Sequence, residues 1–247
     1  MGALHAGHFQ LIKRARELSD EVVVSIFVNP LQFENAEDLA KYPRNIEADT
    51  EAALNAGATS IWAPTVQEMY PEQNVPLISA GRMGTIFEGA SRAGHFDGVL
   101  TVVNRLFEHV QPRYAIFGEK DFQQLTIIKS WVASNSIPVE IVGEPTIRDA
   151  DGLALSSRNI RLGDAGRSAA GIIPKALSAA ITNRSVDAGR EILASEPAFT
   201  LDYFDFVDEQ DLHSQSDMNE SGRFLIAGWV NQVRLLDNMQ MNSAALA

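Results

Sequence analysis

The chain has 247 residues, of which 45% are hydrophobic and 21% charged, and its formal net charge at pH 7 is −12. This length and hydrophobic content predict a real core, in one large domain or two modest ones, and argue against disorder. The lack of cysteine excludes disulfides, thiolate catalysis and zinc–cysteine sites, and it fits a reducing compartment. The acidic balance argues against general nucleic-acid binding, so an anionic substrate would need a locally positive pocket. No apolar run is long enough to span a membrane.

The first part of the chain alternates helical and extended patterns. Its predicted elements are helix 7–18, strand 22–28, helix 46–55 stopped by Gly57, strand 60–63, a helix opened by Gly98, strand 114–117, a helix carrying Leu125, Ile128 and Trp131, and strand 139–142. Short apolar strands separated by helices are typical of a parallel, doubly wound α/β sheet. Ligands bind at the carboxyl ends of the strands in such sheets.

The pattern changes after about residue 147. Helices are predicted at 165–181 and 186–194, followed by two strands at 201–207 and 224–230. This order predicts a smaller α+β module. We therefore expect two domains, 1–146 and 147–247.

The opening octet, Met1 to His8, carries the sharpest local signal. His5 and His8 are three residues apart, so both imidazoles lie on one face of the first turn of a helix. Unpaired N–H groups and the helix dipole attract anions there, and Gly7 lets a ligand approach the backbone. The octet predicts a phosphate site, while a metal site or an ordinary capped helix start remain alternatives.

Three further clusters are rich in polar groups. Phe117 to Gln124 includes a lysine suited to phosphate and an aspartate suited to magnesium; Leu155 to Asn159 combines hydroxyls with an arginine; Arg92 to Phe96 places a cation beside an imidazole. Each of the three could also be an ordinary solvated loop or a capped helix start. No Gly-x-Ser-x-Gly elbow and no glycine-rich nucleotide fingerprint is present. The clusters together indicate chemistry by positioning and charge stabilisation, without a covalent enzyme intermediate.

These segments resemble the pantothenate synthetase (pantoate–β-alanine ligase) family of the nucleotidyltransferase superfamily. The resemblance is carried, in order, by Met1 to His8, Ser25 to Phe33, Tyr42-Pro43-Arg44, Glu68 to Pro71, Gly94 to Val99, Phe117 to Gln124, and Asp151 to Asn159. It implies a Rossmann-like nucleotide- and pantoate-binding domain followed by a C-terminal lid. It also implies ATP-dependent condensation of pantoate with β-alanine through a pantoyl adenylate, with release of pyrophosphate and then AMP.

The resemblance assigns roles to individual residues. His5, His8, Lys120 and Arg158 would be catalytic, and Asp121 would lie near Mg²⁺. The ATP-binding residues would be Met1, His8, Gly118, Lys120, Asp121, Ile147, Leu155, Ser156, Ser157 and Arg158. Pantoate would be held by Gln32 and Gln124, with Met1 and Phe27 walling its pocket. Arg92 and His95 would be neighbours of the site, and the protein would be a cytoplasmic homodimer.

Two departures from the family pattern stand out. Ala93 occupies a position where the family usually has proline, which should only loosen a loop. The family also has a strand before the Met-Gly-Ala-Leu-His segment. From this we expect either that some twenty residues are missing upstream of Met1 or that the chain folds poorly and barely turns over. The alternatives to the ligase are an N-terminally truncated relative that only binds nucleotide, or an adenylyltransferase of the same superfamily. Gln32 and Gln124 favour a small hydroxy acid over a second nucleotide.

Overall fold

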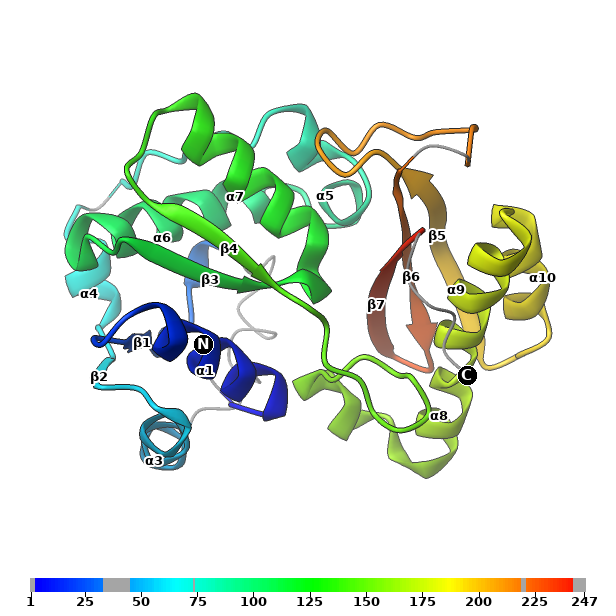
Figure 1. The fold of residues 1–247 in the computed structure, drawn as a ribbon, viewed down its shortest axis with the longest axis horizontal. Helices are drawn as coiled ribbons and strands as arrows, with labels where there is room; N and C mark the ends of the chain where they lie inside the picture. The colour runs from blue at the N-terminus through cyan, green and yellow to red at the C-terminus, as the bar shows by residue number, and fades with distance from the viewer. Residues whose placement is uncertain (1–2, 33–44, 73, 219–220, 242–247) are drawn as a thin grey trace. The chain divides into compact units, whose positions relative to one another are not determined.

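The computed structural model describes residues 3–32, 45–72, 74–218 and 221–241 (Figure 1). The chain divides into two compact units. Unit 1 comprises Met1–Glu119 and Gln123–Glu144, and unit 2 comprises Lys120–Phe122 and Pro145–Ala247. The short segment Lys120–Phe122 groups with the C-terminal residues, although it directly follows a strand of unit 1.

Unit 1 alternates helices with short strands, as the sequence predicts. Its elements are α1 (Ala6–Leu18), β1 (Val23–Ser25), η1 (Pro30–Gln32), α3 (Ile46–Ala56), β2 (Ser60–Trp62), α4 (Val66–Met69), η2 (Arg82–Thr85), α5 (Glu88–Ser91), α6 (His95–Val110), β3 (Tyr114–Gly118), α7 (Phe122–Ser134), which starts at the border between the units, and β4 (Glu140–Glu144). The strands pair in parallel, β1 with β2 and β3 with β4. The parallel pairing confirms the predicted α/β class.

Helices cover both faces of the parallel strands. Ile61 and Trp62 are neighbours on β2, so their side chains point to opposite faces. Ile61 packs into a cluster with Ile12 of α1 and Ala53 of α3, whereas Trp62 packs against the cluster built by α6 and α7. Figure 1 shows α6 and α7 together beside β3 and β4. This is the layering expected of a doubly wound arrangement.

The parallel sheet differs from the prediction in extent. A single sheet was expected, but the described residues form two separate two-stranded sheets, β1-β2 and β3-β4. The predicted strand 22–28 is also shorter, because the ladder ends after Ser25 and only Ile26 N–H continues it, to the Trp62 carbonyl at 2.9 Å. The expectation of an upstream strand stays a prediction.

The start of α6 was predicted too late. Gly57 ends α3 in the left-handed conformation (φ 113°), as predicted. In contrast, α6 begins at His95, directly after Gly94 (φ 76°), and Gly98 lies inside it. The prediction followed the apolar stripe from Val99, but Phe96 already belongs to that stripe and is 2% exposed.

Unit 2 has its own sheet and its own core. After η3 (Glu119–Asp121), which spans the border, its elements are η4 (Ser157–Arg161), α8 (Gly163–Ala170), α9 (Ile172–Asn183), α10 (Val186–Ala194), β5 (Phe199–Val207), β6 (Arg223–Val230) and β7 (Val233–Gln240). The strands form an antiparallel sheet in the order β5-β6-β7. Phe204, Phe206 and Phe224 are at most 2% exposed in its core.

Two predictions for unit 2 were wrong in detail. The single helix 165–181 is two helices that meet at Gly171, and Pro174 lies in the first turn of the second, where its missing N–H is tolerated. The two predicted strands are three, because residues after Asn231 form β7. Asp237 and Asn238 interrupt its apolar pattern, which obscures the strand signal.

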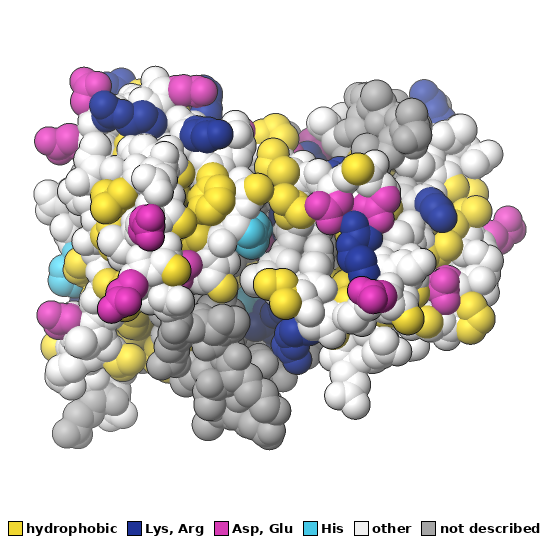
Figure 2. All heavy atoms as spheres, turned by 90° about the horizontal axis from the view of Figure 1, so that it is seen from below, with side chains coloured by type: hydrophobic (Ala, Val, Ile, Leu, Met, Phe, Trp, Pro, Cys, Tyr) yellow, Lys and Arg dark blue, Asp and Glu magenta, His cyan; other side chains and the backbone are white. Residues whose placement is uncertain are grey.

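The negative charge is dispersed over the one face of the molecule that Figure 2 presents. Figure 2 shows acidic side chains scattered among basic and apolar ones over the face that it presents. Among the described residues, no helix combines the length and the apolar character that a membrane span requires.

Candidate active site

The imidazoles of His5 and His8 form the start of α1. His5 is the N-cap, and its Nδ1 accepts a hydrogen bond from the Gly7 N–H at 3.2 Å. The His5 N–H donates in turn to Nδ1 of His8 at 3.2 Å, and the ring centroids lie 4.1 Å apart. A neutral ring that accepts at Nδ1 carries its proton on Nε2, so Nε2 is the donor atom of each ring. An added Cβ at Gly7 would lie 3.0 Å from the His5 ring, so this close packing favours glycine.

A buried carboxylate holds the segment that precedes the histidine pair. Asp49 on α3 is 5% exposed and accepts the backbone N–H groups of Ala3 and Leu4 at 2.9 and 2.8 Å. These two bonds satisfy a carboxylate that would otherwise be costly to bury. The same bonds occupy the backbone N–H groups of Ala3 and Leu4, which are therefore not available to bind an anionic ligand. Asp49 therefore sets the path of the chain into His5, a role that its sequence neighbourhood does not reveal.

Gln32 lies in a loop that Asn29 organises. Asn29 is 2% exposed and donates from Nδ2 to the Gly98 carbonyl at 3.1 Å and to Oε1 of Gln32 at 3.3 Å. Its Oδ1 accepts the hydroxyl of Tyr70 at 2.8 Å. Burial raises the pKa of Tyr70, so its hydroxyl stays a donor. A Cβ at Gly98 would come within 2.3 Å of the Leu31 carbonyl oxygen, so this glycine lets the loop lie against α6.

Two further predicted neighbours contact the same loop. Arg92 donates from Nη2 to the Gln32 carbonyl at 3.2 Å, and Nδ1 of His95 lies 3.0 Å from the same oxygen. Arg92 Nη1 and His95 Nε2 are 3.1 Å apart. Phe27 packs edge-on against Tyr70, with ring centroids 6.1 Å apart. The structure therefore brings Phe27, Gln32, Arg92 and His95 into one neighbourhood of unit 1.

The two adjacent glutamines on α7 have different environments. Gln123 is 5% exposed, donates to the carbonyls of Met83 and Ile86 at 2.7 and 2.8 Å, and accepts the Glu88 N–H at 3.0 Å. Its side chain therefore has a structural role, since it holds the backbone of residues 83–88 against α7. Gln124, the predicted pantoate ligand, is half-buried beside it.

The segment after β3 carries the predicted Gly118, Lys120 and Asp121. A Cβ at Gly118 would meet only Leu11 at 3.9 Å, an ordinary contact, so packing does not require glycine there. In η3, Nζ of Lys120 lies 3.6 Å from the Asp121 carboxylate. The Asp121 side chain is 51% exposed, so water and a ligand can reach it.

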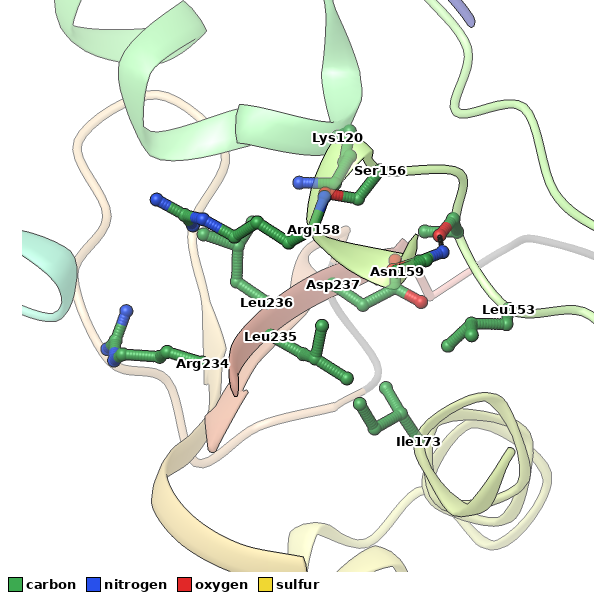
Figure 3. Close-up of a pocket in the computed structure, with 11 residues that line it drawn as sticks. Lys120, Leu153, Ser156, Arg158, Asn159, Ile173, Arg234, Leu235, Leu236 and Asp237 are labelled. Atoms are coloured by element: carbon green, nitrogen blue, oxygen red, sulfur yellow. Dashed lines mark hydrogen bonds between the residues drawn. The ribbon is translucent and has the colours of Figure 1, made fainter. Parts of the chain in front are cut away.

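A pocket of unit 2 brings Lys120 together with Ser156 and Arg158 (Figure 3). Lys120 comes from η3, Ser156 is the N-cap of η4, and Arg158 is the second residue of η4. The remaining lining residues are Leu153, Ala154, Asn159, Ile173, Arg234, Leu235, Leu236 and Asp237. Sequence reasoning missed Arg234 and Asp237, which lie on β7 in Figure 3.

Local hydrogen bonds shape the serine–arginine segment. Oγ of Ser156 accepts the Arg158 N–H at 3.2 Å and so caps η4, and Nδ2 of Asn159 donates to the Ala154 carbonyl at 3.0 Å. The predicted Leu155 and Ile147 are half-buried and are joined by a backbone bond of 2.9 Å. Ser157, also half-buried, is the first residue of η4.

A charged clamp fixes the turn that leads into this segment. Arg167 on α8 donates to Asp151 at 2.6 and 2.9 Å and to Asp149 at 2.8 Å. Its hydrogen bonds lower the pKa of the Asp151 carboxyl to about 2 and raise the pKa of Arg167 itself. Gly152, at the tip of the turn, has φ 86°.

The predicted site residues thus form groups within each unit. Unit 1 holds His5, His8, Phe27, Gln32, Gly118 and Gln124, and unit 2 holds Lys120, Asp121, Ile147, Leu155, Ser156, Ser157 and Arg158. Met1 lies outside the described residues. Among the described residues, no three histidines, aspartates or glutamates gather as a metal site. Asp121 alone suits an ion that arrives with its own phosphate and water ligands.

An imidazole pair at a helix start and a pocket lined by lysine, serine and arginine are typical of proteins that bind phosphorylated ligands on an α/β scaffold. Comparison with known proteins identifies the family. Residues 1–240 match the family model described as pantoate-beta-alanine ligase. Pantothenate synthetase of Acidothermus cellulolyticus is 45% identical over 256 residues, covering 99% of this chain and 84% of the relative. That of Thermus thermophilus is 44% identical over 250 residues, covering 98% and 91%.

Solved structures agree with this match. The crystal structure of pantothenate synthetase from Thermus thermophilus superposes with a TM-score of 0.94 at 43% identity, covering 98% of this chain and 91% of that one. The enzyme from Francisella tularensis, complexed with Beta-gamma ATP and Beta-alanine, gives 0.84 at 33% identity, covering 99% and 88%. The chain belongs to the pantoate–β-alanine ligase family, and it is an ATP-dependent ligase that joins pantoate to β-alanine.

Proposed function

We propose that the chain makes pantothenate in two steps, through a pantoyl adenylate, with the residues named above as its machinery. The observation that carries the proposal is the unit 2 pocket, which gathers Lys120, Ser156 and Arg158. The net charge of −12 creates an electrostatic field that repels an anionic substrate. A pocket with two cationic side chains and a serine hydroxyl supplies the local attraction that such a substrate needs.

In the first step, a carboxylate oxygen of pantoate attacks the α-phosphorus of ATP. The new oxygen–phosphorus bond forms as the bond to the β-phosphate oxygen breaks, and pyrophosphate leaves. Negative charge builds on the phosphate oxygens, and preorganised donors stabilise it. Nε2–H of His5 and His8, Nζ of Lys120 and the guanidinium of Arg158 are these donors, while Ser156 and Ser157 hydrogen-bond the phosphates.

Pantoate is held by groups that suit a small hydroxy acid. Gln32, whose Oε1 accepts from Asn29 at 3.3 Å, and Gln124 grip its oxygens. Met1 and Phe27 wall its apolar methyl groups. Gly118, Ile147 and Leu155 line the nucleotide side, where a glycine that packing does not require allows close approach.

Mg²⁺ enters this proposal as the ion that accompanies ATP. The exposed carboxylate of Asp121 would hold it, and the bound ion would neutralise charge on the phosphates. Lys120, 3.6 Å from the same carboxylate, keeps its own charge balanced until the nucleotide arrives.

In the second step, the amine of β-alanine attacks the acyl carbon, and AMP leaves with the bridging oxygen. A mixed anhydride must be sheltered from water, so we assign residues 147–247 as a lid that carries Ser156, Ser157 and Arg158. From the family resemblance we further assign a cytoplasmic homodimer formed through the N-terminal domain.

The test is pantoate-dependent exchange of labelled pyrophosphate into ATP, without β-alanine. Exchange is expected, because formation of the adenylate is reversible before the amine attacks. Omission of pantoate is the control and should abolish it. A preparation that makes pantothenate but supports no exchange would contradict the adenylate route.

A further inference from the structure

A consecutive buried polar pair, Asp237 and Asn238, lies on β7 beneath the pocket of unit 2. The two residues are 3% and 2% exposed. Neighbours on a strand point to opposite faces, so both faces of β7 are covered at this point. Burying a carboxylate and an amide is costly unless each finds partners.

Asp237 connects β7 to the turn before the serine–arginine segment. Its carboxylate accepts both Nη atoms of Arg148, at 2.6 and 3.0 Å. The same guanidinium donates to the carbonyls of Gly152 at 3.0 Å and Asn238 at 2.9 Å. Arg148 therefore ties the turn that leads to Ser156 onto the strand.

Asn238 connects the same strand to Lys120. Its Nδ2 donates to the Lys120 carbonyl at 2.9 Å, and its Oδ1 accepts Nη1 of Arg223 at 2.6 Å. Arg223 is also paired with Glu209 at 2.7 Å and lies 4.0 Å above the ring of Phe122. Because a carbonyl can only accept and a guanidinium can only donate, this position needs one donor and one acceptor on a short side chain.

We infer that Asn238 is a positioning residue for the reaction: it fixes the main chain of Lys120 relative to the segment that carries Ser156 and Arg158. Lys120 and Ser156 are far apart in sequence, but both are supported by adjacent residues of β7. The inference rests on the proposed role of Lys120 at the phosphates. Displacement of a catalytic group by about 1 Å can cost on the order of 100-fold in rate, so a single hydrogen bond to its backbone matters.

The decisive variant is Asn238→Asp, which keeps the size and the acceptor for Arg223. It replaces the Nδ2 donor by an oxygen that faces the Lys120 carbonyl. We expect kcat/KM for ATP to fall about 10- to 100-fold, while the KM for β-alanine stays within about twofold. Rates are taken per active site, counted from the burst of pyrophosphate, at a temperature where melting curves show the variant folded.

Two matched controls separate positioning from stability. Asn183→Asp makes the same chemical change at the exposed last residue of α9, where Nδ2 donates to the Ala179 carbonyl at 2.8 Å. Leu193→Ala weakens the core of unit 2 at a residue of α10 that is 3% exposed and does not line the pocket. Both should keep kcat/KM for ATP near the wild-type value, although Leu193→Ala melts earlier.

The outcomes are distinct. A folded Asn238→Asp enzyme with wild-type kcat/KM for ATP overturns the inference, and so does an equal loss in Leu193→Ala. If Asn238→Asp does not fold, Asn238→Ala decides by the same criterion, because it removes the donor without adding repulsion. If the wild-type chain shows no pantoate-dependent exchange, the proposed function fails and this inference fails with it. If the wild type supports exchange but the Asn238 variants keep its kcat/KM for ATP, the inference is overturned and the proposed function stands.

Discussion

At the scale of single residues, His5 and His8 serve the helix and the proposed chemistry through different atoms. Their Nδ1 atoms accept backbone N–H groups at the start of α1. This arrangement resembles a capping box, in which the N-cap and the third helical residue satisfy each other's backbone donors. The helix start therefore sets both the orientation and the tautomer of the two rings.

Because capping and catalysis use different atoms of His8, they can be separated by substitution. His8→Ala should lose about 2–4 kcal/mol of transition-state stabilisation, the cost of removing one preorganised donor. His8→Gln should lose as much activity but keep its melting temperature, since glutamine at this position can still accept the N-cap N–H. Steady-state kinetics and thermal melting check both effects.

The matched control is His213→Gln, which alters an exposed histidine of unit 2. This substitution should change neither the activity nor the melting temperature. A loss of less than tenfold in turnover for His8→Ala would remove His8 from the catalytic residues.

At the scale of elements, the turn between β4 and η4 depends on charge as well as on hydrogen bonds. Arg167 bridges Asp149 and Asp151, whose side chains are 41% and 47% exposed. Water screens pairs this exposed, so the clamp contributes on the order of 1 kcal/mol. It acts on the turn that leads into Ser156.

The clamp predicts a pH dependence of stability. The pKa of Asp151 falls from 3.8 to about 2 in the folded protein, chiefly through its hydrogen bonds to Arg167. A carboxyl with a depressed pKa stabilises the fold fully above its unfolded pKa, and that stability is lost as the pH falls through the folded value. The difference in free energy of unfolding between wild type and Asp151→Asn should be constant above about pH 5 and shrink towards pH 2. Urea unfolding at several pH values measures it; a difference that grows on acidification would contradict the assignment.

At the scale of the whole molecule, two units with separate cores are joined through residues 119–123 and 144–145. Each unit holds part of the predicted machinery, with the histidine pair in one and Lys120 and Arg158 in the other. If the reaction needs both groups of side chains, we expect the two units to change their relative position during turnover.

The lid prediction can be tested with spin labels, because the chain has no cysteine of its own. Glu51→Cys in unit 1 and Glu191→Cys in unit 2 place labels at exposed positions. ATP with pantoate should shift or narrow the distance distribution between them. A pair within unit 2, Asp164→Cys with Glu191→Cys, is the control and should not change. Identical distributions with and without substrates would refute a moving lid.

Much of the local structure and the family could be predicted from the sequence, because both depend on short-range patterns. The spacing of His5 and His8, the glycine that ends α3 and the stripe of α6 all follow from helix periodicity. Where patterns were interrupted the predictions were wrong: Pro174 marks the break between α8 and α9, and the polar pair within β7 obscured a strand.

The residues that support the candidate site emerged only from the tertiary structure. Asp49 bonds to backbone 46 and 45 residues away, and Arg148 bonds to Asp237 across 89 residues. No local periodicity encodes such bonds, since they depend on which buried polar groups the fold brings within hydrogen-bond distance. The sequence by itself determined the chemical groups, their helices and the family. The tertiary structure decided which carboxylates and amides hold those groups in place, because a buried polar atom bonds to whichever partner the fold brings near it, however distant that partner is in the sequence.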